Sequence, residues 1–291
     1  MELVFFGSGP VAKKCLELLS KNFKIEAIIT KDSTQEMMSS VDLSVPVLCA
    51  NNKLELNKLL ESTKFNSKIA VLIDFGIIVS SDVISTFPLG IINSHFSRLP
   101  EWRGADPITY SILSGQKSTG VTLMLIDEGM DTGKILTQKS IPINNNDSTE
   151  LTDRLIKLSD SLLNKYLPLY SDGLISPRNQ SHPERATYSS KLSKEDGKID
   201  WNKTAEVIER EIRAYIEWPR SYTKIGELDV IIKKAKVIDL IGAPGKCSIH
   251  NKNELVIHCG KGSLLIEEIQ PSGKKIMTAK DFLLGYQSKI I

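Results

Sequence analysis

The sequence predicts an α/β domain followed by a small β-barrel domain, and three observations support this fold class. Apolar runs at residues 3–6 and 25–29 flank a segment with helical spacing, which is the pattern of a β-α-β unit. Residues 171–200 are rich in Ser, Pro, Gly and charged side chains, as linkers are. From residue 221 onward, short β-type runs alternate with Gly, Pro and Asn, which is typical of a small barrel.

The chain is long enough for two ordinary domains, and its charge is divided unevenly between them. We place a first domain at residues 1–183, a linker at 184–205 and a second domain at 206–291. Residues 1–206 hold 23 Lys and Arg against 25 Asp and Glu, a net charge of −2, whereas residues 207–291 hold 14 against 10, a net charge of +4. The small overall charge of +2 does not by itself indicate a polyanionic partner.

Cysteine usage and hydropathy predict a cytoplasmic protein. The 4 cysteines are scattered without Cys-x-x-Cys spacing, and no apolar run approaches the roughly 20 residues of a membrane span. A core strand begins at once at the amino end, so no signal peptide is expected. No Cys and His residues have zinc-type spacing, so we expect no metal, and we expect a monomer.

The first strand is followed by a glycine turn that permits two interpretations. Gly7-x-Gly9-x-x-Ala12 looks like a dinucleotide fingerprint, and Glu26 or Asp32 supplies an acidic residue about 20 positions on. This pattern allows a nicotinamide-dependent oxidoreductase as an alternative. Glycine is also needed wherever a strand turns tightly into a helix packed on the sheet, so we interpret the turn as the architecture of a Rossmann-like domain.

Residues 31–44 are polar, lack clear periodicity and are long for a connection between a strand and a helix. Loops of this length are usually functional or disordered. Residues 69–73 then predict another buried strand, with Asp74, Phe75 and Gly76 at its carboxyl end.

Polar residues with catalytic potential follow the next two predicted strands. The apolar run at residues 89–92 predicts a buried strand of a parallel sheet, and Asn93 and His95 at its carboxyl end would share one face because they are two positions apart. Asp131 lies in a Gly-flanked loop after a predicted strand at residues 121–126. Ligands of open α/β sheets bind at the carboxyl ends of the strands, so we expect a site here.

This trio of side chains predicts acyl transfer. Asn93 offers an N–H donor to a developing oxyanion, and His95 can donate as imidazolium and pass a proton to a leaving nitrogen. Asp131 can hold His95 charged or take a proton from an attacking amine. The alternative is that these residues have only structural roles, His95 as a single histidine at a strand end and Asp131 as part of a surface turn rich in Asp and Gly.

Helix signals follow in the rest of the chain. Asp106 is a candidate cap for a helix at residues 107–114, and Arg103 just before it is a candidate phosphate ligand. Asp147-x-x-Glu150 predicts a capping box at the start of a long helix that continues through residue 170. A helix at residues 201–214 carries Arg210 and Arg213, and a last helix is capped by Thr278 and ends at Gly285.

The segments NSHFSRLPEWRGADP at residues 93–107 and GVTLMLIDEGMDTGKIL at residues 120–136 resemble the 10-formyltetrahydrofolate-dependent formyltransferases, specifically the methionyl-tRNA formyltransferase family. The likeness continues in KLSKEDGKIDW at residues 191–201, IRAYIEWPRSYT at 212–223 and QPSGKKIMTAKDFLLG at 270–285. The resemblance implies a Rossmann-like formyltransferase domain, a C-terminal OB-like β-barrel domain, and a catalytic trio of Asn93, His95 and Asp131.

The resemblance also implies the reaction and a folate site. The formyl group of 10-formyltetrahydrofolate, a co-substrate, would pass to the methionine amino group of initiator Met-tRNA; the alternative acceptor is an amino-sugar nucleotide. The residues implied to contact the folate are Phe75, Gly76, Ile77, Ser97, Leu99, Pro100, Asp127, Glu128, Gly129 and Met130. We expect Gly129 and Gly133 to permit a positive φ and a close approach to the flat ring.

Three features depart from this family. In the family, the loop corresponding to residues 31–44 is basic and rich in Gly and helps to grip the tRNA, whereas here Lys31 is its single cation, against Asp32, Glu36 and Asp42. Asp74 is unusual at its position, as is Arg98. We therefore expect phosphate contacts on the barrel, from Lys233, Lys234, Lys236, Lys246, Lys252 and Lys261.

Overall fold

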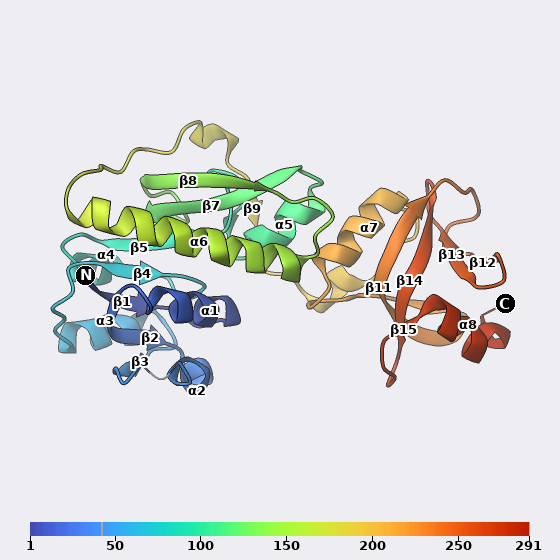
Figure 1. Cartoon of the computed structure of the whole chain (residues 1–291), viewed down its shortest axis with the longest axis horizontal. Coiled ribbons are helices and arrows are strands. Elements are labelled where there is room, and N and C mark those ends of the chain that lie inside the picture. The colour runs from blue at the N-terminus through green and yellow to red at the C-terminus, as the bar shows by residue number, and fades with distance from the viewer. Residues whose placement is uncertain (42, 291) are drawn as a thin grey trace. The chain divides into compact units, whose positions relative to one another are not determined.

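The structure is a computed structural model that describes residues 1–41 and 43–290, so the predicted acidic residue Asp42 lies outside the described residues. The chain divides into two compact units. Figure 1 shows the whole chain, coloured by residue number from the N-terminus to the C-terminus. The first comprises Met1–Pro107, Ser118–Pro142 and Thr152–Ser190, and the second comprises Ile108–Lys117, Ile143–Leu151 and Lys191–Ile291. The domain boundaries predicted from the sequence, after residues 183 and 205, concern which segments fold independently, so they stay a prediction.

The first unit is built on a seven-stranded sheet with the strand order β3-β2-β1-β4-β5-β7-β8. The strands are β1 (Glu2–Phe6), β2 (Lys24–Thr30), β3 (Val47–Cys49), β4 (Ala70–Leu72), β5 (Ile91–His95), β7 (Ser118–Leu125) and β8 (Ile135–Pro142). Strands β1 to β5 pair in parallel, while β7 is antiparallel to both β5 and β8. The strand order reverses between β1 and β4, which is the switch point where such sheets bind ligands.

The strand predicted at residues 89–92 begins later and extends further, as β5 (Ile91–His95). The polar residues Asn93 and His95 belong to the strand because β7 pairs with them, opposite Met124 and Thr122. All five residues of β5 are buried. The catalytic candidates therefore lie on a strand that is held on both sides, which limits their motion.

Helices cover the sheet (Figure 1). They are α1 (Pro10–Leu19), α3 (Lys53–Ser62), α4 (Ser81–Ser85) and α6 (Ser148–Ser171). Val4 and Phe6 of β1 belong to a core cluster that includes residues of α3 and α4. The predicted capping box of α6 is confirmed, because the Glu150 N–H donates to Asp147 at 2.9 Å and the Asp147 N–H donates to Glu150 at 3.2 Å.

Residues 31–44 were expected to be a loop without secondary structure, and this is wrong for part of the segment. A short 3-10 turn, Asp32–Thr34, leads into α2 (Gln35–Ser39). Met38 is fully buried and anchors this helix. A helix of 5 residues is too short to produce a visible 3.6-residue periodicity, so the pattern could not reveal it.

The second unit contains an antiparallel sheet with the strand order β10-β11-β14-β13-β12, and β15 pairs with β14. Its strands are β10 (Ser221–Ile225), β11 (Leu228–Ile238), β12 (Cys247–His250), β13 (Glu254–His258), β14 (Ser263–Pro271) and β15 (Met277–Thr278). Its helices are α5 (Pro107–Leu113), α7 (Ala205–Ala214) and α8 (Ala279–Tyr286). Side chains of α7, α8 and the sheet form one apolar core, as an OB-like domain requires.

Caps explain the ends of the helices in this unit. The helix predicted from residue 201 begins only at Ala205, because the Thr204 side chain accepts the Val207 N–H and thereby caps α7. The predicted cap Thr278 is confirmed, since it accepts the Asp281 N–H at 3.2 Å. Helix α8 continues one residue past the predicted end, through Tyr286. None of the helices in the described part of the chain is long and apolar enough to cross a membrane.

Part of the polar stretch at residues 171–200 does not behave as a free linker. Strand β9 (Tyr188–Ser189) pairs in parallel with β6 (Arg103–Gly104). Arg178 forms a backbone bridge with Ile135, with N···O distances of 2.7 and 3.0 Å. Composition alone could not reveal these contacts, because backbone groups make them and the side chains remain polar.

Candidate active site

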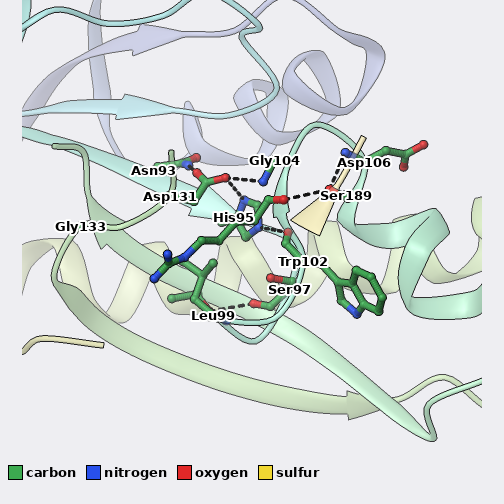
Figure 2. Close-up of polar contacts among 12 residues, drawn as sticks. Asn93, His95, Ser97, Leu99, Trp102, Gly104, Asp106, Asp131, Gly133 and Ser189 are labelled. Atoms are coloured by element: carbon green, nitrogen blue, oxygen red, sulfur yellow. Dashed lines mark hydrogen bonds and ion pairs between the residues drawn. The ribbon is translucent and has the colours of Figure 1, made fainter. Parts of the chain in front are cut away.

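The structure brings Asn93, His95 and Asp131 together at the carboxyl end of β5 (Figure 2). The Asn93 amide Nδ2 donates to Asp131 Oδ1 at 3.3 Å, and His95 Nδ1 lies 3.7 Å from Asp131 Oδ2. The side chains of His95 and Asp131 are only 6% and 15% exposed. An amide donor, an imidazole and a carboxylate therefore share one mostly dehydrated corner of the sheet, where electrostatic interactions are strong.

The other ring nitrogen of His95 is fixed by the backbone. His95 Nε2 lies 2.9 Å from the Trp102 carbonyl oxygen, which can only accept a hydrogen bond, so Nε2 carries a proton. Nδ1, on the other edge of the ring, faces the Asp131 carboxylate at 3.7 Å. The Nδ1 edge is thus the edge on which His95 can exchange a proton with a substrate.

Asp131 accepts hydrogen bonds on both carboxylate oxygens. Besides the bond from Asn93 to Oδ1, the Gly104 N–H donates to Oδ2 at 2.7 Å. Gly104 has a φ of 112°, and a Cβ at this position would lie 2.4 Å from the Ser189 carbonyl oxygen. Only glycine therefore fits where β6 approaches β9 and delivers this N–H to the carboxylate.

The expectation that Gly129 and Gly133 adopt positive φ is wrong. In this loop the residue with a positive φ is Asp131 itself, at 52°. The two glycines are required by space instead, because a Cβ would lie 2.0 Å from Thr132 Oγ1 at Gly129 and 1.7 Å from the Leu125 carbonyl oxygen at Gly133. These close approaches are to the Thr132 side chain and to the last residue of β7, and the predicted approach to a flat ring stays a prediction.

The candidate folate residues at 97–100 are largely buried inside the protein. Ser97 is fully buried, and its hydroxyl donates to the Glu101 carbonyl. The Leu99 side chain is 4% exposed, and its N–H donates to Thr122 Oγ1 at 3.2 Å. A cis peptide bond joins Leu99 to Pro100. The side chains of Ser97 and Leu99 therefore lie inside the protein, and a ligand would contact this segment through its backbone groups and Pro100.

The candidate folate residues at 75–77 follow β4, whose Leu72 pairs with Asn93 of β5. The Phe75 ring is 2% exposed and packs edge-on against Phe6 at a centroid distance of 5.4 Å. Only the Phe75 backbone can therefore face a ligand. Gly76, with a φ of 65°, is exposed and Ile77 is half-buried.

The candidate residues 127–130 form the exposed part of the loop that carries Asp131. Asp127 Oδ1 accepts the Gly129 N–H at 3.1 Å and the Thr132 hydroxyl at 2.7 Å, so this carboxylate organises the turn. Glu128 is exposed, and Met130 is 64% exposed. An exposed thioether beside a catalytic carboxylate offers an adaptable apolar surface to a flat ligand.

The glycine turn after β1 is occupied by the protein's own carboxylate. Asp74 accepts the backbone N–H groups of Val11 and Ala12 at the start of α1, and a Cβ on Gly9 would lie 1.7 Å from Asp74 Oδ2. Burial raises the pKa of Asp74 to about 6, although these hydrogen bonds and Lys31 oppose the rise. A dinucleotide phosphate would need the same helix N-terminus, so the architectural interpretation of the turn is favoured over the oxidoreductase.

Arg103, the candidate phosphate ligand, is held inside the protein, which favours the commoner structural role of an arginine. It is 6% exposed, and one of its terminal nitrogens donates to Gln180 Oε1 at 2.7 Å. Sequence reasoning missed Gln180, the Trp102 carbonyl and the Gly104 N–H. No local signal marks these groups, because each acts through contacts between distant segments or through a backbone atom that every residue possesses.

The basic residues of the second unit divide into engaged and exposed groups. Lys233 donates to the Ile216 carbonyl at 2.8 Å, and burial lowers the pKa of Lys233. Lys234 and Lys236 both pair with Glu267. Lys246, Lys252 and Lys261 are exposed. On α7, Arg210 donates to the Leu113 carbonyl at 3.2 Å, and Arg213 is paired with Glu209. Lys234 and Lys236 are nevertheless exposed, at 62% and 68% of their side chains, so of the six predicted lysines only Lys233 is largely shielded, and their contact with phosphate stays a prediction.

Comparison with known proteins agrees with this fold. Residues 11–167 match the formyl transferase family, and residues 191–287 match the formyl transferase C-terminal domain. The class of protein that the fold and the site define is thus the formyl transferases. Curated proteins named methionyl-tRNA formyltransferase are 36% identical in Thermodesulfovibrio yellowstonii, over 97% of this chain and 95% of the relative, and 32% identical in Citrifermentans bemidjiense, over 99% and 94%. The chain belongs to the methionyl-tRNA formyltransferase family, which confirms the resemblance inferred from the sequence.

Solved structures share the fold at lower sequence identity. An N-formyltransferase from Helicobacter canadensis, in complex with folinic acid and dTDP-3-aminofucose, has a TM-score of 0.68 at 20% identity, over 93% of this chain and 100% of that chain. HypX from Aquifex aeolicus, in complex with tetrahydrofolic acid, has a TM-score of 0.66 at 14% identity, over 99% and 48%. These structures confirm the predicted two-part fold class.

Proposed function

We propose that this protein transfers the formyl group of 10-formyltetrahydrofolate to the α-amino group of methionine on initiator tRNA. The observation that carries the proposal is the contact of Asp131 with Asn93, His95 and Gly104 at the end of β5. Amide, imidazole and carboxylate groups suffice for formyl transfer between two amines, and no covalent enzyme intermediate is required. The chain's membership of the methionyl-tRNA formyltransferase family supports the choice of acceptor.

The first chemical step is attack of the amine on the formyl carbon. The C–N bond forms, the electron pair of the carbonyl moves to oxygen, and a tetrahedral intermediate results. One N–H of the Asn93 amide is used by Asp131, and the second N–H is the donor that would stabilise the oxyanion. Asp131 takes the proton that the attacking nitrogen loses.

The second step breaks the bond to the folate nitrogen. His95 donates its Nδ1 proton to that nitrogen as the carbonyl re-forms, and Nε2 keeps its proton on the Trp102 carbonyl. The proton gained by Asp131 then returns to His95 Nδ1, which lies 3.7 Å away in the ligand-free structure. Each proton is accounted for, and the trio is restored for the next turnover.

The two substrates would use different surfaces. We propose that the folate contacts the backbone of residues 75–77 and the exposed loop 127–130, because the Phe75 side chain is buried in the core. The tRNA would use the exposed cations Lys246, Lys252 and Lys261. Such a substrate places the activity in the cytoplasm, and we keep the expectation of a monomer.

One observation favours the alternative acceptor, an amino-sugar nucleotide. Lys31, the single cation of residues 31–44, donates to the Gly76 carbonyl at 3.3 Å. The segment that grips tRNA elsewhere in the family therefore offers no free cation here among its described residues. This observation bears on the acceptor and not on the chemistry of the trio.

The decisive experiment compares acceptors. Purified protein is given 10-formyltetrahydrofolate with methionine-charged initiator tRNA, uncharged tRNA or an amino-sugar nucleotide, and a His95→Ala variant is the blank. Formylation of the charged tRNA that disappears in the variant is the expected result. Formyl transfer to the sugar but not to the tRNA would keep the chemistry and refute the acceptor.

A further inference from the structure

Gln180 is a buried polar residue in the polar segment that follows α6. Its side chain is 9% exposed, whereas the neighbouring Asn179 is exposed. Glutamine is seldom buried unless its amide is satisfied by hydrogen bonds, so its partners indicate why it lies there.

The Gln180 amide is satisfied by the catalytic loop and by Arg103. Its Nε2 donates to the Asp131 carbonyl at 2.7 Å and to the Gly133 carbonyl at 3.1 Å. Its Oε1 accepts from Arg103 at 2.7 Å. One side chain thus uses both N–H groups and its oxygen to join two segments that meet at the active site.

These hydrogen bonds hold the backbone that carries the Asp131 carboxylate. Asp131 has a left-handed φ of 52°, a conformation that persists in a non-glycine residue only when its surroundings fix it. Gln180 binds the carbonyls of Asp131 and Gly133, two residues apart, and so fixes the peptide planes on the carboxyl side of Asp131. The direction of the carboxylate toward His95 follows from this backbone.

The same segment holds the second partner of His95. Thr187 Oγ1 accepts the Trp102 N–H at 2.9 Å, and the Arg103 N–H donates to the Thr187 carbonyl at 2.9 Å. The Trp102 carbonyl is the group that fixes His95 Nε2. Gln180 therefore supports one side of the imidazole through Asp131, and Thr187 supports the other side through Trp102.

We propose that residues 178–189 hold the catalytic side chains in place and that Gln180 and Thr187 are positioning residues for formyl transfer. This inference rests on the proposed function. Neither side chain has to touch a substrate, so its loss should lower kcat and leave the KM for both substrates nearly unchanged.

The main test uses Gln180→Glu. The variant keeps the size of the side chain and gives Arg103 a charged partner, but its carboxylate cannot donate to the Asp131 and Gly133 carbonyls. We expect kcat to fall by about 10- to 100-fold, the cost of a small misplacement of a catalytic group, with each KM within about 3-fold. The matched control is Asn179→Ala, which should behave as the wild type.

Two further measurements separate positioning from a general defect. In an Asp131→Asn background, Gln180→Glu should change kcat by less than about 2-fold, because the group through which Gln180 acts is already altered. If Gln180→Glu does not fold, the exposed Thr187 decides: Thr187→Val should lower kcat, and Thr187→Ser should restore it. If Gln180→Glu lowers kcat by the same factor in the wild type and in the Asp131→Asn background, the inference is overturned. Full activity of Thr187→Val would also overturn it.

A readout that needs no activity distinguishes this inference from the proposed function. The Gly104 N–H is bound to Asp131 Oδ2, so its hydrogen exchange reports where the carboxylate lies. We expect faster exchange of Gly104 in Gln180→Glu and unchanged exchange in Asn179→Ala. Unchanged exchange and kcat in Gln180→Glu refute the positioning role, whereas an inactive wild type with the expected exchange pattern refutes only the proposed function.

Discussion

Asp131→Asn is the substitution that most directly tests the candidate active site. The carboxylate accepts the Gly104 N–H on one oxygen and the Asn93 amide on the other. An asparagine has one acceptor oxygen and one NH₂ group, so it can serve Gly104 only by turning its NH₂ toward the Asn93 NH₂. Asn93 must then rotate its amide to present oxygen, and the N–H donor proposed for the oxyanion moves away.

The expected loss of rate has two parts. The Coulomb attraction between opposite charges 3.7 Å apart is about 4 kcal/mol at an effective dielectric constant of about 20, and Asp131→Asn removes this support of charged His95. Loss of an oxyanion donor alone lowers kcat by about 10²–10³. Because the two effects concern one cluster they do not add, so we expect kcat to fall by about 10³, with each KM within about 3-fold.

The assay is single-turnover formyl transfer to methionine-charged initiator tRNA at saturating 10-formyltetrahydrofolate, with thermal unfolding measured on the same samples. Asp82→Asn is the matched control, because Asp82 is an exposed carboxylate in the first turn of α4. It should retain the wild-type rate. A rate for Asp131→Asn within about 3-fold of the wild type, with both variants folded, would refute the role given to the carboxylate.

Three further outcomes are expected. Desolvation raises the pKa of Asp74 from 3.8 to about 6, so its contribution to stability is present below pH 3.8 and is lost as the pH rises through about 6. Asp74→Asn should therefore raise the free energy of unfolding at pH 8 but not at pH 4, by less than about 1 kcal/mol because the residue is exposed. An equal change at both pH values would contradict this. Replacing Lys246, Lys252 and Lys261 together by Ala should weaken the salt dependence of tRNA binding. The slope of log K against log salt concentration should become shallower by up to about 0.9 for each phosphate that is no longer neutralised. An unchanged slope would show that these lysines do not contact the tRNA phosphates. Gly104→Ala places a Cβ 2.4 Å from the Ser189 carbonyl oxygen at a φ of 112°. It should lower the free energy of unfolding by about 1–3 kcal/mol and should also lower kcat. A variant as stable and as active as the wild type would contradict the close approach.

Local signals allowed much of the fold to be predicted from the sequence. The strand-turn-helix opening, the Asp147 capping box and the Thr278 cap each depend on residues close together in the chain, and each is confirmed. Helix α2 was missed because it is only 5 residues long. The extent of β5 was underestimated because a hydropathy pattern cannot detect polar residues that a neighbouring strand pairs and buries.

The candidate site could be predicted only as far as side-chain chemistry marks it. Asn93, His95 and Asp131 could be singled out because an amide, an imidazole and a carboxylate have the chemistry that acyl transfer requires, and because their segments resemble those of a known family. Their supports are backbone atoms or residues remote in sequence: the Trp102 carbonyl, the Gly104 N–H and Gln180, which is 49 positions from Asp131. Such groups carry no signal in a single sequence, because their function depends on which distant segment lies beside them.

Two carboxylates near the carboxyl ends of the parallel strands β4 and β5 have different surroundings: Asp74 follows β4 directly, whereas Asp131 comes from the loop after β7, which is antiparallel to β5. Asp74 follows β4 at the switch point and accepts the N–H groups at the start of α1, so the anion site of the glycine turn is already filled. The positive end of that helix is neutralised, and a phosphate placed there would meet a like charge. Asp131 faces strand β5, where the Asn93 amide donates to it and His95 Nδ1 lies 3.7 Å away, so its proposed role is catalytic. The site therefore lies at β5, beside the switch point, where an acyl group and two amines can be bound without a phosphate at the glycine turn.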